Sequence, residues 1–254
     1  MKNGIETRAA VCPAHGDYES RTLVLMGRTM GWSKCQKCSI EQSECEAKER
    51  ATIAERDRQR QIEQRLNRAG IPLRFRSRSF DTFIADTEAK AHCLHVSVEF
   101  ASRFIDHQAR GTTMIYSGKP GTGKSHLATS ICQEIIEAGR TAMYINALDA
   151  IRLIRSTWRR DSVMTESIAM ASLIGVDLLV IDEVGAQYGT EGEQVILFDI
   201  INRRYEDQQP IILLTNQGKE GLKQFLGDRA FDRLREAGKW LAFDWDSHRG
   251  AVNA

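Results

Sequence analysis

Long apolar runs are missing from this sequence, and so is an excess of charge of either sign. No apolar stretch approaches the roughly 20 residues of a membrane-spanning helix, and the first ten residues, MKNGIETRAA, contain no apolar signal-peptide core. Lysine and arginine number 35 against 34 aspartates and glutamates, so total charge argues neither for nor against a nucleic-acid partner. We therefore expect a soluble intracellular protein without a membrane partner.

Proline and glycine are both missing between residues 40 and 69. This stretch is rich in Glu, Arg, Gln and Ala, which favours a helix, but its few larger apolar residues form only a thin stripe. We predict a helical linker over 40–69 that is broken at Gly70 and Pro72. The linker would separate an N-terminal domain, 1–39, from a C-terminal domain, 70–254.

Cysteine is infrequent, with 6 residues, but its placement near the N-terminus is informative. The pairs CPAH and CQKC are separated by 19 residues, which is typical of a structural zinc site and predicts a small ribbon-like domain with a hairpin between the pairs. Cys45 could replace the histidine or remain a free thiol, and Cys93 and Cys132 fall in helical patterns that predict core positions. The predicted Zn²⁺ ligands are Cys12, His15, Cys35 and Cys38.

The stretch SGKPGTGKSHLA, residues 117–128, contains the pattern G-x-x-x-x-G-K-S/T of phosphate-binding loops. Its glycines let the backbone approach phosphate oxygens, while Lys124 would contact the β- and γ-phosphates and Ser125 would bind Mg²⁺. TTMIYS before the loop predicts a buried strand, and the residues after it predict a helix that stops at Gly139. The predicted nucleotide-binding residues of this motif are Gly118, Gly121, Gly123, Lys124, Ser125 and His126.

Two further apolar stretches, DLLVIDEV and PIILLTNQG, end in polar residues. Because the carboxyl ends of parallel strands face the ligand crevice, Asp182 is expected to hold Mg²⁺ with the nucleotide, and Glu183 to deprotonate the attacking water. The alternative is a solvated acidic turn. Asn216 could lie near the γ-phosphate or cap the following helix. Together with TAMYINA, these strands alternate with helical segments and predict an α/β fold with a parallel sheet covered on both faces.

Arginines are prominent in two later parts of the chain. In AIRLIRSTWRR, Ile151, Ile154 and Trp158 share one helix face beside a row of arginines, which suits a single DNA strand or, equally, a core-facing stripe with solvated arginines. P-loop catalysis often uses an arginine to neutralise transition-state charge. The candidates for that role near the C-terminus are Arg229, Arg233, Arg235 and Arg249.

Several of these motifs together resemble one known family. SGKPGTGKSHLA, VDLLVIDEVGAQ, LLTNQG, LGDRAFDRLRE and FDWDSHR are similar, in order and spacing, to the DnaC-type replicative helicase loaders of the AAA+ superfamily. LNRAGIPLRFRSRSFDTF resembles the segment that enters the ATPase domain of that family. The resemblance covers about 67–249 and implies an AAA+ P-loop ATPase fold with ATP and Mg²⁺ as cofactors.

The resemblance also implies roles for single residues. Asn216 corresponds to sensor 1, Arg233 to an arginine finger inserted into a neighbour's site, and Arg249 to sensor 2. These three residues and Glu183 are the predicted catalytic residues. The segment Ile71–Phe75 would lie near the adenine.

The implied function is delivery of a hexameric replicative helicase onto single-stranded DNA, with ATP hydrolysis driving release. The implied partners are the helicase, the DNA and further copies of the chain in an open spiral, in the cytoplasm of a bacterial cell or phage-infected host. The zinc pattern departs from loaders whose N-terminal region is only helical, and by position it would replace the helicase-docking region. The alternatives are an IstB-type transposition helper that binds duplex DNA and a transposase, or a DNA-binding adaptor that uses ATP only as a switch. The intact Asp182–Glu183 pair argues against the adaptor.

Overall fold

The computed structural model describes residues 4–186, 189–236 and 238–248. The chain divides into two compact units, Met1–Gln61 and Ile62–Ala254. Helix α1 (Gln36–Arg68) belongs partly to each unit and begins earlier than the helix predicted from residue 40. Within the described residues, no helix combines the length and apolar character that crossing a bilayer requires.

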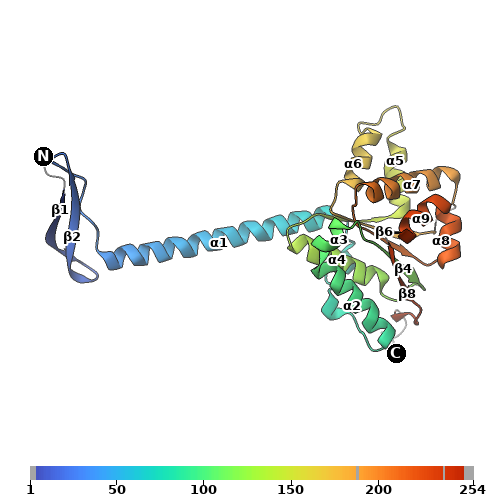
Figure 1. Ribbon diagram of the computed structural model, residues 1–254, viewed down its shortest axis with the longest axis horizontal. Coiled ribbons are helices and arrows are strands. Elements are labelled where there is room, and N and C mark those ends of the chain that lie inside the picture. The colour runs from blue at the N-terminus through green and yellow to red at the C-terminus, as the bar shows by residue number, and fades with distance from the viewer. Residues whose placement is uncertain (1–3, 187–188, 237, 249–254) are drawn as a thin grey trace. The chain divides into compact units, whose positions relative to one another are not determined.

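The N-terminal unit contains an antiparallel sheet of β1 (Gly4–Cys12), β2 (Gly16–Leu25) and β3 (Arg28–Thr29), in that order (Figure 1). β1 pairs with β2 along its whole length, and the Cys12↔Gly16 pair closes the turn, where Gly16 has a φ of +77°. The predicted hairpin between the two metal-ligand pairs is present only as the short β2–β3 pairing. The longer hairpin uses residues before Cys12, whose mixed composition gave no strand signal.

The C-terminal unit is built on a five-stranded sheet with the order β5-β6-β7-β4-β8, in which every pairing is parallel. The four strands expected from the sequence are present, which confirms the predicted parallel α/β sheet. The fifth strand, at the β8 edge, was not predicted because the charged and aromatic stretch GKWLAF resembles the end of a helix. The strands are β4 (Thr113–Gly118), β5 (Ala142–Asn146), β6 (Leu178–Val184), β7 (Ile211–Thr215) and β8 (Gly238–Phe243).

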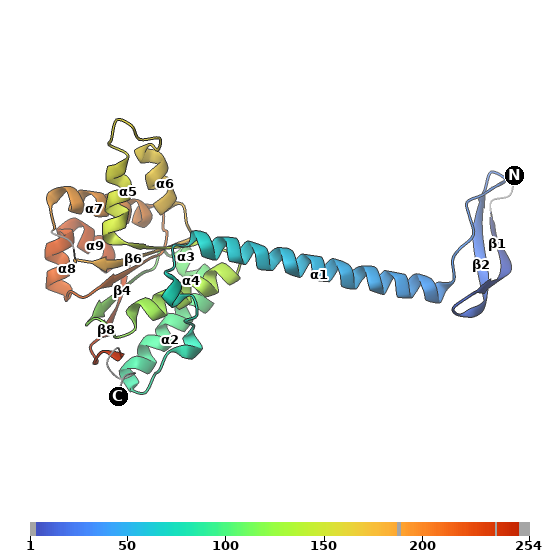
Figure 2. The same ribbon diagram turned by 180° about the vertical axis from the view of Figure 1, so that it is seen from behind.

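Two helical layers cover the sheet (Figures 1 and 2). One layer consists of α2 (Glu88–Ser102), α3 (Phe104–Ala109) and α4 (Lys124–Glu137). The other consists of α5 (Ala147–Ser156), α6 (Glu166–Ile174), α7 (Glu191–Glu206), α8 (Lys219–Leu226) and α9 (Asp228–Glu236). Between α1 and α2 lies a connecting segment, residues 70–84, with two single turns of 3₁₀ helix, Leu73–Phe75 and Phe80–Thr82.

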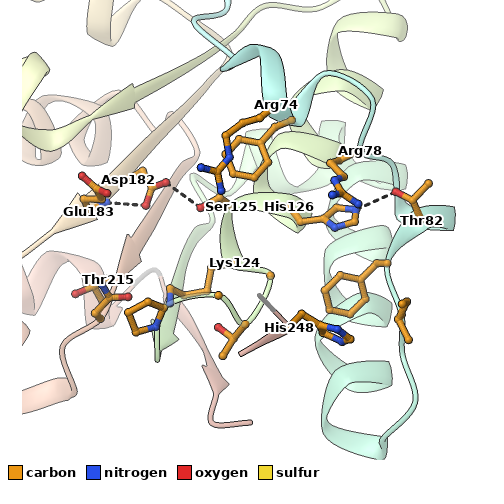
Figure 3. Close-up of a pocket in the computed structure, with 18 residues that line it drawn as sticks. Arg74, Arg78, Thr82, Lys124, Ser125, His126, Asp182, Glu183, Thr215 and His248 are labelled. Atoms are coloured by element: carbon orange, nitrogen blue, oxygen red, sulfur yellow. Dashed lines mark hydrogen bonds between the residues drawn. The ribbon is translucent and has the colours of Figure 1, made fainter. Parts of the chain in front are cut away.

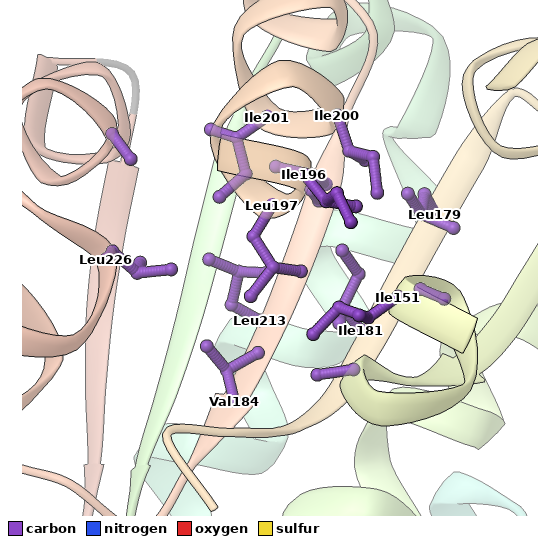
Figure 4. Packing of buried hydrophobic residues seen from close by; sticks show 14 of the residues in the cluster. Ile151, Leu179, Ile181, Val184, Ile196, Leu197, Ile200, Ile201, Leu213 and Leu226 are labelled. Carbon is purple, nitrogen blue, oxygen red and sulfur yellow. The ribbon is translucent and has the colours of Figure 1, made fainter. Parts of the chain in front are cut away.

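Successive strand residues alternate between the two layers. In β6, Ile181 packs against the α5–α9 layer and Val180 against the α2–α4 layer. Figure 4 shows the first of these clusters, where Ile181 and Leu213 face Leu197 of α7. Because both faces are buried, the strands need continuous apolar runs, and polar side chains with a function are confined to the strand ends.

Arg204 on α7 is the largest fully buried side chain among the described residues. Its guanidinium donates hydrogen bonds to five backbone carbonyls, at 2.6–3.3 Å, on Leu173, Ile174, Val176, Asp177 and Pro210. These carbonyls lie at the end of α6 and before β6 and β7, and that of Pro210 also accepts a bond from the strand backbone, from Leu179 N at 3.4 Å. Burial lowers the pKa of Arg204 to about 9, so the group remains charged at neutral pH and holds α6 to the sheet.

Candidate nucleotide site and metal centre

The phosphate-loop motif forms the turn between β4 and α4. Gly121 and Gly123 have φ values of +81° and +97°, which explains the requirement for glycine there. Lys124, the first residue of α4, is buried, and its Nζ donates to the carbonyl oxygens of Gly118 at 2.5 Å and Lys119 at 2.7 Å. The loop therefore surrounds the lysine that is predicted to contact the phosphates.

A pocket of about 390 Å³ opens at the carboxyl edge of the sheet (Figure 3). It brings together most of the predicted site residues from three strand ends, although Gly118 and Arg233 are not among the described residues that line it. Arg249 lies outside the described residues. The predicted residues that line the pocket are Gly121, Gly123, Lys124, Ser125, His126, Asp182, Glu183 and Asn216.

Asp182 and Ser125 face each other across the pocket floor (Figure 3). Ser125 Oγ donates to Asp182 Oδ2 at 3.0 Å, and the Tyr144 hydroxyl donates to the same oxygen. Burial raises the pKa of Tyr144, so its hydroxyl keeps the proton that it donates. A hydroxyl beside a carboxylate is the ligand pair that P-loop ATPases use for Mg²⁺, so these residues could hold that ion.

Glu183 has an unusual backbone conformation for an acidic residue. Its φ is +58°, and the β6–β7 ladder shifts register between Ile181 and Val184 around it. The side-chain amide of Asn146 donates to Glu183 Oε2, while the Asn146 side-chain oxygen accepts from Leu148 N at 2.9 Å and caps α5. Such strain is typical of functional positions, and here Asn146 fixes the direction of the carboxylate.

Sequence analysis missed both Asn146 and Tyr144. The usable signal was their position, because Asn146 is the last residue of β5 and pairs in register with Asp182. The carboxyl ends of parallel strands face the ligand, and this rule applies to TAMYINA as well as to DLLVIDEV and PIILLTNQG.

Asn216 directly follows β7 and lines the pocket with an exposed side chain. Helix α8 has Gly218 as its N-cap, so Asn216 is not the helix cap that the sequence left as an alternative. Thr215 Oγ1 donates to the Val184 carbonyl at 2.6 Å and fastens the end of β7 to the end of β6. The role of Asn216 in hydrolysis stays a prediction.

His126 contacts the connecting segment. Its Nε2 lies 2.7 Å from the carbonyl oxygen of Ser79 and 3.1 Å from Thr82 Oγ1, and its ring meets Phe83 edge-on. Burial lowers the pKa of His126, so the imidazole is neutral at pH 7. These contacts of the predicted nucleotide-binding residue His126 therefore fasten the segment that closes one side of the pocket.

The connecting segment itself supplies several residues of the pocket. Arg74, Phe75 and Arg78 line the pocket, whereas Ile71 is buried in the core with only 3% of its surface exposed. Ile71 therefore does not line the pocket, and the placement of Ile71–Phe75 by the adenine stays a prediction.

The chain after β8 lies against the phosphate loop. Trp245 Nε1 donates to the Thr122 carbonyl at 2.9 Å, and the backbone N–H of His248 donates to the Gly121 carbonyl at 3.0 Å. These bonds satisfy carbonyl groups of the phosphate loop, whose backbone N–H groups are the expected donors to phosphate. The FDWDSHR segment therefore supports the loop's shape.

Arg233 lies on α9, in a groove with Arg229 between α7 and α9. Its guanidinium stacks on the Tyr205 ring, with 4.6 Å between the Cζ atom and the ring centroid. Among the described residues that line the nucleotide pocket, none belongs to α9. Arg233 is thus absent from the pocket of its own subunit.

The predicted helix face of Ile151, Ile154 and Trp158, on α5 and just after it, contains both buried and exposed side chains. Ile151 and Ile154 are fully buried, whereas Trp158 is 59% exposed and its Nε1 donates to Glu166 Oε2 at 2.7 Å. Of the neighbouring arginines, Arg155 lies 4.0 Å from the buried carboxylate of Glu193. The two isoleucines are therefore core residues, as one of the two interpretations predicted, whereas the tryptophan is not.

The four predicted metal ligands come together in the N-terminal unit, with their donor atoms all within 4.8 Å of one another. The Sγ atoms of Cys12 and Cys38 are 3.4 Å apart, and His15 Nδ1 lies 3.2 Å from Cys38 Sγ and 3.8 Å from Cys35 Sγ. A tetrahedral zinc ion places its ligand atoms roughly 3.5–3.8 Å apart, so the donor set fits Zn²⁺.

Two further features favour a metal at this cluster. A backbone hydrogen bond from Ala14, with a smaller effect of Cys38, lowers the pKa of the Cys12 thiol to about 6, while the hydrogen bond with Cys12 raises the pKa of Cys38 to about 11, so that the pair favours one thiolate. Glu41 Oε1 lies 3.0 Å from His15 Nε2 and so orients Nδ1 toward the sulfurs. Sequence analysis missed Glu41, although it lies one helical turn beyond Cys38. Cys45 is exposed on α1 and is not in the cluster.

Comparison with known proteins agrees with this geometry. The family described as IstB-like ATP binding protein matches residues 44–249. The replicative helicase loader DnaC of Escherichia coli (strain K12) is 34% identical over 203 residues, which are 80% of this chain and 81% of that protein.

Solved structures match the fold of the C-terminal unit. A crystal structure of the DnaC helicase loader superimposes with a TM-score of 0.61 at 19% identity, over 67% of this chain and 99% of that one. A crystal structure of DnaI gives a TM-score of 0.59 at 15% identity, over 70% and 94% of the two chains. The predicted AAA+ architecture is thus confirmed, and the chain belongs to the family of IstB-like ATP-binding proteins that resemble the DnaC loaders.

Proposed function

We propose that this chain is an ATP-driven loader that delivers a replicative helicase onto single-stranded DNA. The observation that carries the proposal is the 34% identity with the Escherichia coli loader, which extends over 81% of that protein rather than over the phosphate loop alone. A shared P-loop would indicate only nucleotide binding. The protein would act in the bacterial cytoplasm.

The nucleotide site would bind and hydrolyse ATP with Mg²⁺. Lys124 would contact the β- and γ-phosphates, while Ser125 and Asp182, already paired at 3.0 Å, would hold the ion. Glu183, oriented by Asn146, would take a proton from the attacking water. Asn216 would position the water or the γ-phosphate, and Arg249 would contact the nucleotide of its own subunit. Hydrolysis would then release the loader.

Arg233 would act on the nucleotide of a neighbouring copy. Its place on α9, outside its own pocket, fits a role in trans and supports assembly of several copies in an open spiral. Each active site would then combine Glu183 of one subunit with Arg233 of its neighbour, so ATP turnover would depend on assembly.

The zinc module would contact the helicase. Several apolar side chains of the N-terminal unit are strongly exposed, which indicates a protein-binding surface. These are Ile5 at 70%, Val11 at 75%, Met26 at 79% and Met30 at 67%. Single-stranded DNA would be held instead by the exposed Trp158 with Arg152 and Arg159, through base stacking and phosphate contacts.

A second candidate function is that of an IstB-like transposition helper, favoured by the family description that matches the chain. The two functions differ in partner, because a helper would bind duplex DNA and a transposase instead of a hexameric helicase.

Loading of helicase onto circular single-stranded DNA tests the choice directly. We expect the wild-type chain with ATP to increase the number of helicase hexamers on the circles at least several-fold, and Lys124→Ala to give no increase. Preference for duplex DNA, with no binding to a replicative helicase of its host, would favour the transposition helper.

Lys124→Ala and Glu183→Gln should separate ATP binding from ATP hydrolysis. Loss of the buried ammonium should abolish ATP binding, whereas the glutamine keeps the shape of the site and should reduce turnover by a factor on the order of 10² or more. Equilibrium binding of a fluorescent ATP analogue and phosphate release measure the two effects. Undiminished turnover in Glu183→Gln would exclude Glu183 as the base.

The full-length protein should contain one Zn²⁺ per chain. Elemental analysis should show loss of the metal from Cys35→Ser and Cys38→Ser but not from Cys45→Ser, the matched control outside the cluster. Glu41→Gln should retain the ion but release it to a competing chelator at roughly tenfold lower chelator concentration. Loss of zinc from Cys45→Ser would show that the ligand set is wrong.

Arg233→Ala should bind ATP almost normally but hydrolyse it poorly, because an arginine finger contributes on the order of 10³ in rate. Mixing it with Glu183→Gln should restore part of the activity, since one composite site then has both Glu183 and a neighbour's Arg233. Arg235→Ala is the matched control, because Arg235 is exposed and paired with Asp232 at 3.2 Å. A co-assembled mixture that is no more active than its components would contradict a role in trans.

A further inference from the structure

We propose that Arg74 binds the terminal phosphate of ATP within its own subunit, so that the site distinguishes ATP from ADP. The inference deepens the proposed ATPase function and rests on it. Arg74 lies in the connecting segment, about 50 positions before the phosphate-loop lysine. We place it at the phosphate end of the site and not beside the adenine, where the family resemblance would put Ile71–Phe75.

Arg74 lies at the end of the pocket where the carboxylates are. A second cavity adjoins the nucleotide pocket, and both are lined by Phe75, Asp182 and Glu183. Of the arginines that line these two cavities in the described part of the chain, only Arg74 borders both. In Figure 3 its guanidinium points toward Ser125 and Asp182.

Arg78 marks the opposite end of the same pocket. Figure 3 shows it beside His126, which contacts Thr82 and Phe83, and it does not border the second cavity. Because Ser125 and Asp182 define the Mg²⁺ end of a bound nucleotide, Arg74 would meet the γ-phosphate, and Arg78 the part of the nucleotide farther from it.

The backbone that carries Arg74 is fixed to the ATPase fold. Its neighbour Phe75 accepts a hydrogen bond through its carbonyl from Gln133 Nε2 of α4 at 3.1 Å, and Ile71 is buried in the core. The Arg74 guanidinium stacks on the Phe75 ring, with Cζ 4.7 Å from the ring centroid. Stacking restricts the long side chain and lowers the entropy cost of holding a phosphate.

Charge balance gives this position a function. Asp182 and Glu183 already place two carboxylates where the γ-phosphate must lie. Lys124 and the Mg²⁺ that Asp182 would hold offset part of this repulsion, and the Arg74 guanidinium would add charge-assisted hydrogen bonds to the γ-phosphate. ADP has no phosphate at that position, so the contact would be specific for ATP.

The test compares ATP and ADP binding by the full-length protein. In a Glu183→Gln background, which prevents turnover, Arg74→Ala should weaken ATP binding roughly tenfold or more but ADP binding by less than about twofold. Arg74→Lys should restore only part of the loss, because an ammonium lacks the planar fork of the guanidinium.

Arg76→Ala is the matched control from the same segment. Arg76 donates to Asn67 Oδ1 at 2.9 Å and to the Ile71 carbonyl at 3.4 Å, and it does not line the nucleotide pocket. This variant should bind both nucleotides like the parent. Retained ADP affinity in Arg74→Ala also shows that the pocket still folds.

Three results would overturn the inference. The first is that Arg74→Ala loses affinity for ATP and ADP equally, and the second is that it loses affinity for neither. The third is that its ATP affinity falls only at protein concentrations where copies associate, which would place Arg74 in a neighbour's site. Failure of the parent protein to bind ATP is a different outcome, because it would overturn the proposed ATPase function itself.

Discussion

The nucleotide site depends on the insertion of β7 between β4 and β6 in a sheet whose strands all run parallel. This order brings the carboxyl ends of three strands to one edge, so that the loop after β4 faces the carboxylates after β6. Ser125 reaches Asp182 across this gap, and Thr215 at the end of β7 ties itself to the Val184 carbonyl. Sequentially distant segments thus converge because of strand order alone.

Burial of both faces of the sheet has a second consequence for the site. Polar side chains are excluded from the strand interiors, and the strained backbone near Asp182 and Glu183 is held in place by a rigid apolar framework. Glu183 keeps a left-handed backbone, which costs on the order of 1–3 kcal/mol, because the strands on either side and Asn146 leave it no alternative. The core therefore contributes directly to the geometry of the candidate site.

The sequence predicted features that are encoded locally and missed those that depend on distant partners. The phosphate loop, the acidic end of β6 and the four predicted metal ligands have fixed spacings that physical chemistry explains, and the structure brings each group together. Tyr144, Asn146 and Glu41 have no such spacing, since each acts through a partner in another element. The same limit explains why β1 was missed, because its pattern becomes clear only when it pairs with β2.

Motifs alone therefore define a phosphate site but do not define its relative affinity for ATP and ADP. The loop, Lys124 and the Ser125–Asp182 pair are properties of P-loop proteins in general. The remaining walls of this pocket come from the connecting segment, through Phe75 and Arg74, and from the chain after β8, which braces the loop through Trp245. Two proteins with identical motifs can thus differ in nucleotide discrimination when these walls differ. The determinants of the ATP-bound state should accordingly be sought in residues that pack around the motif.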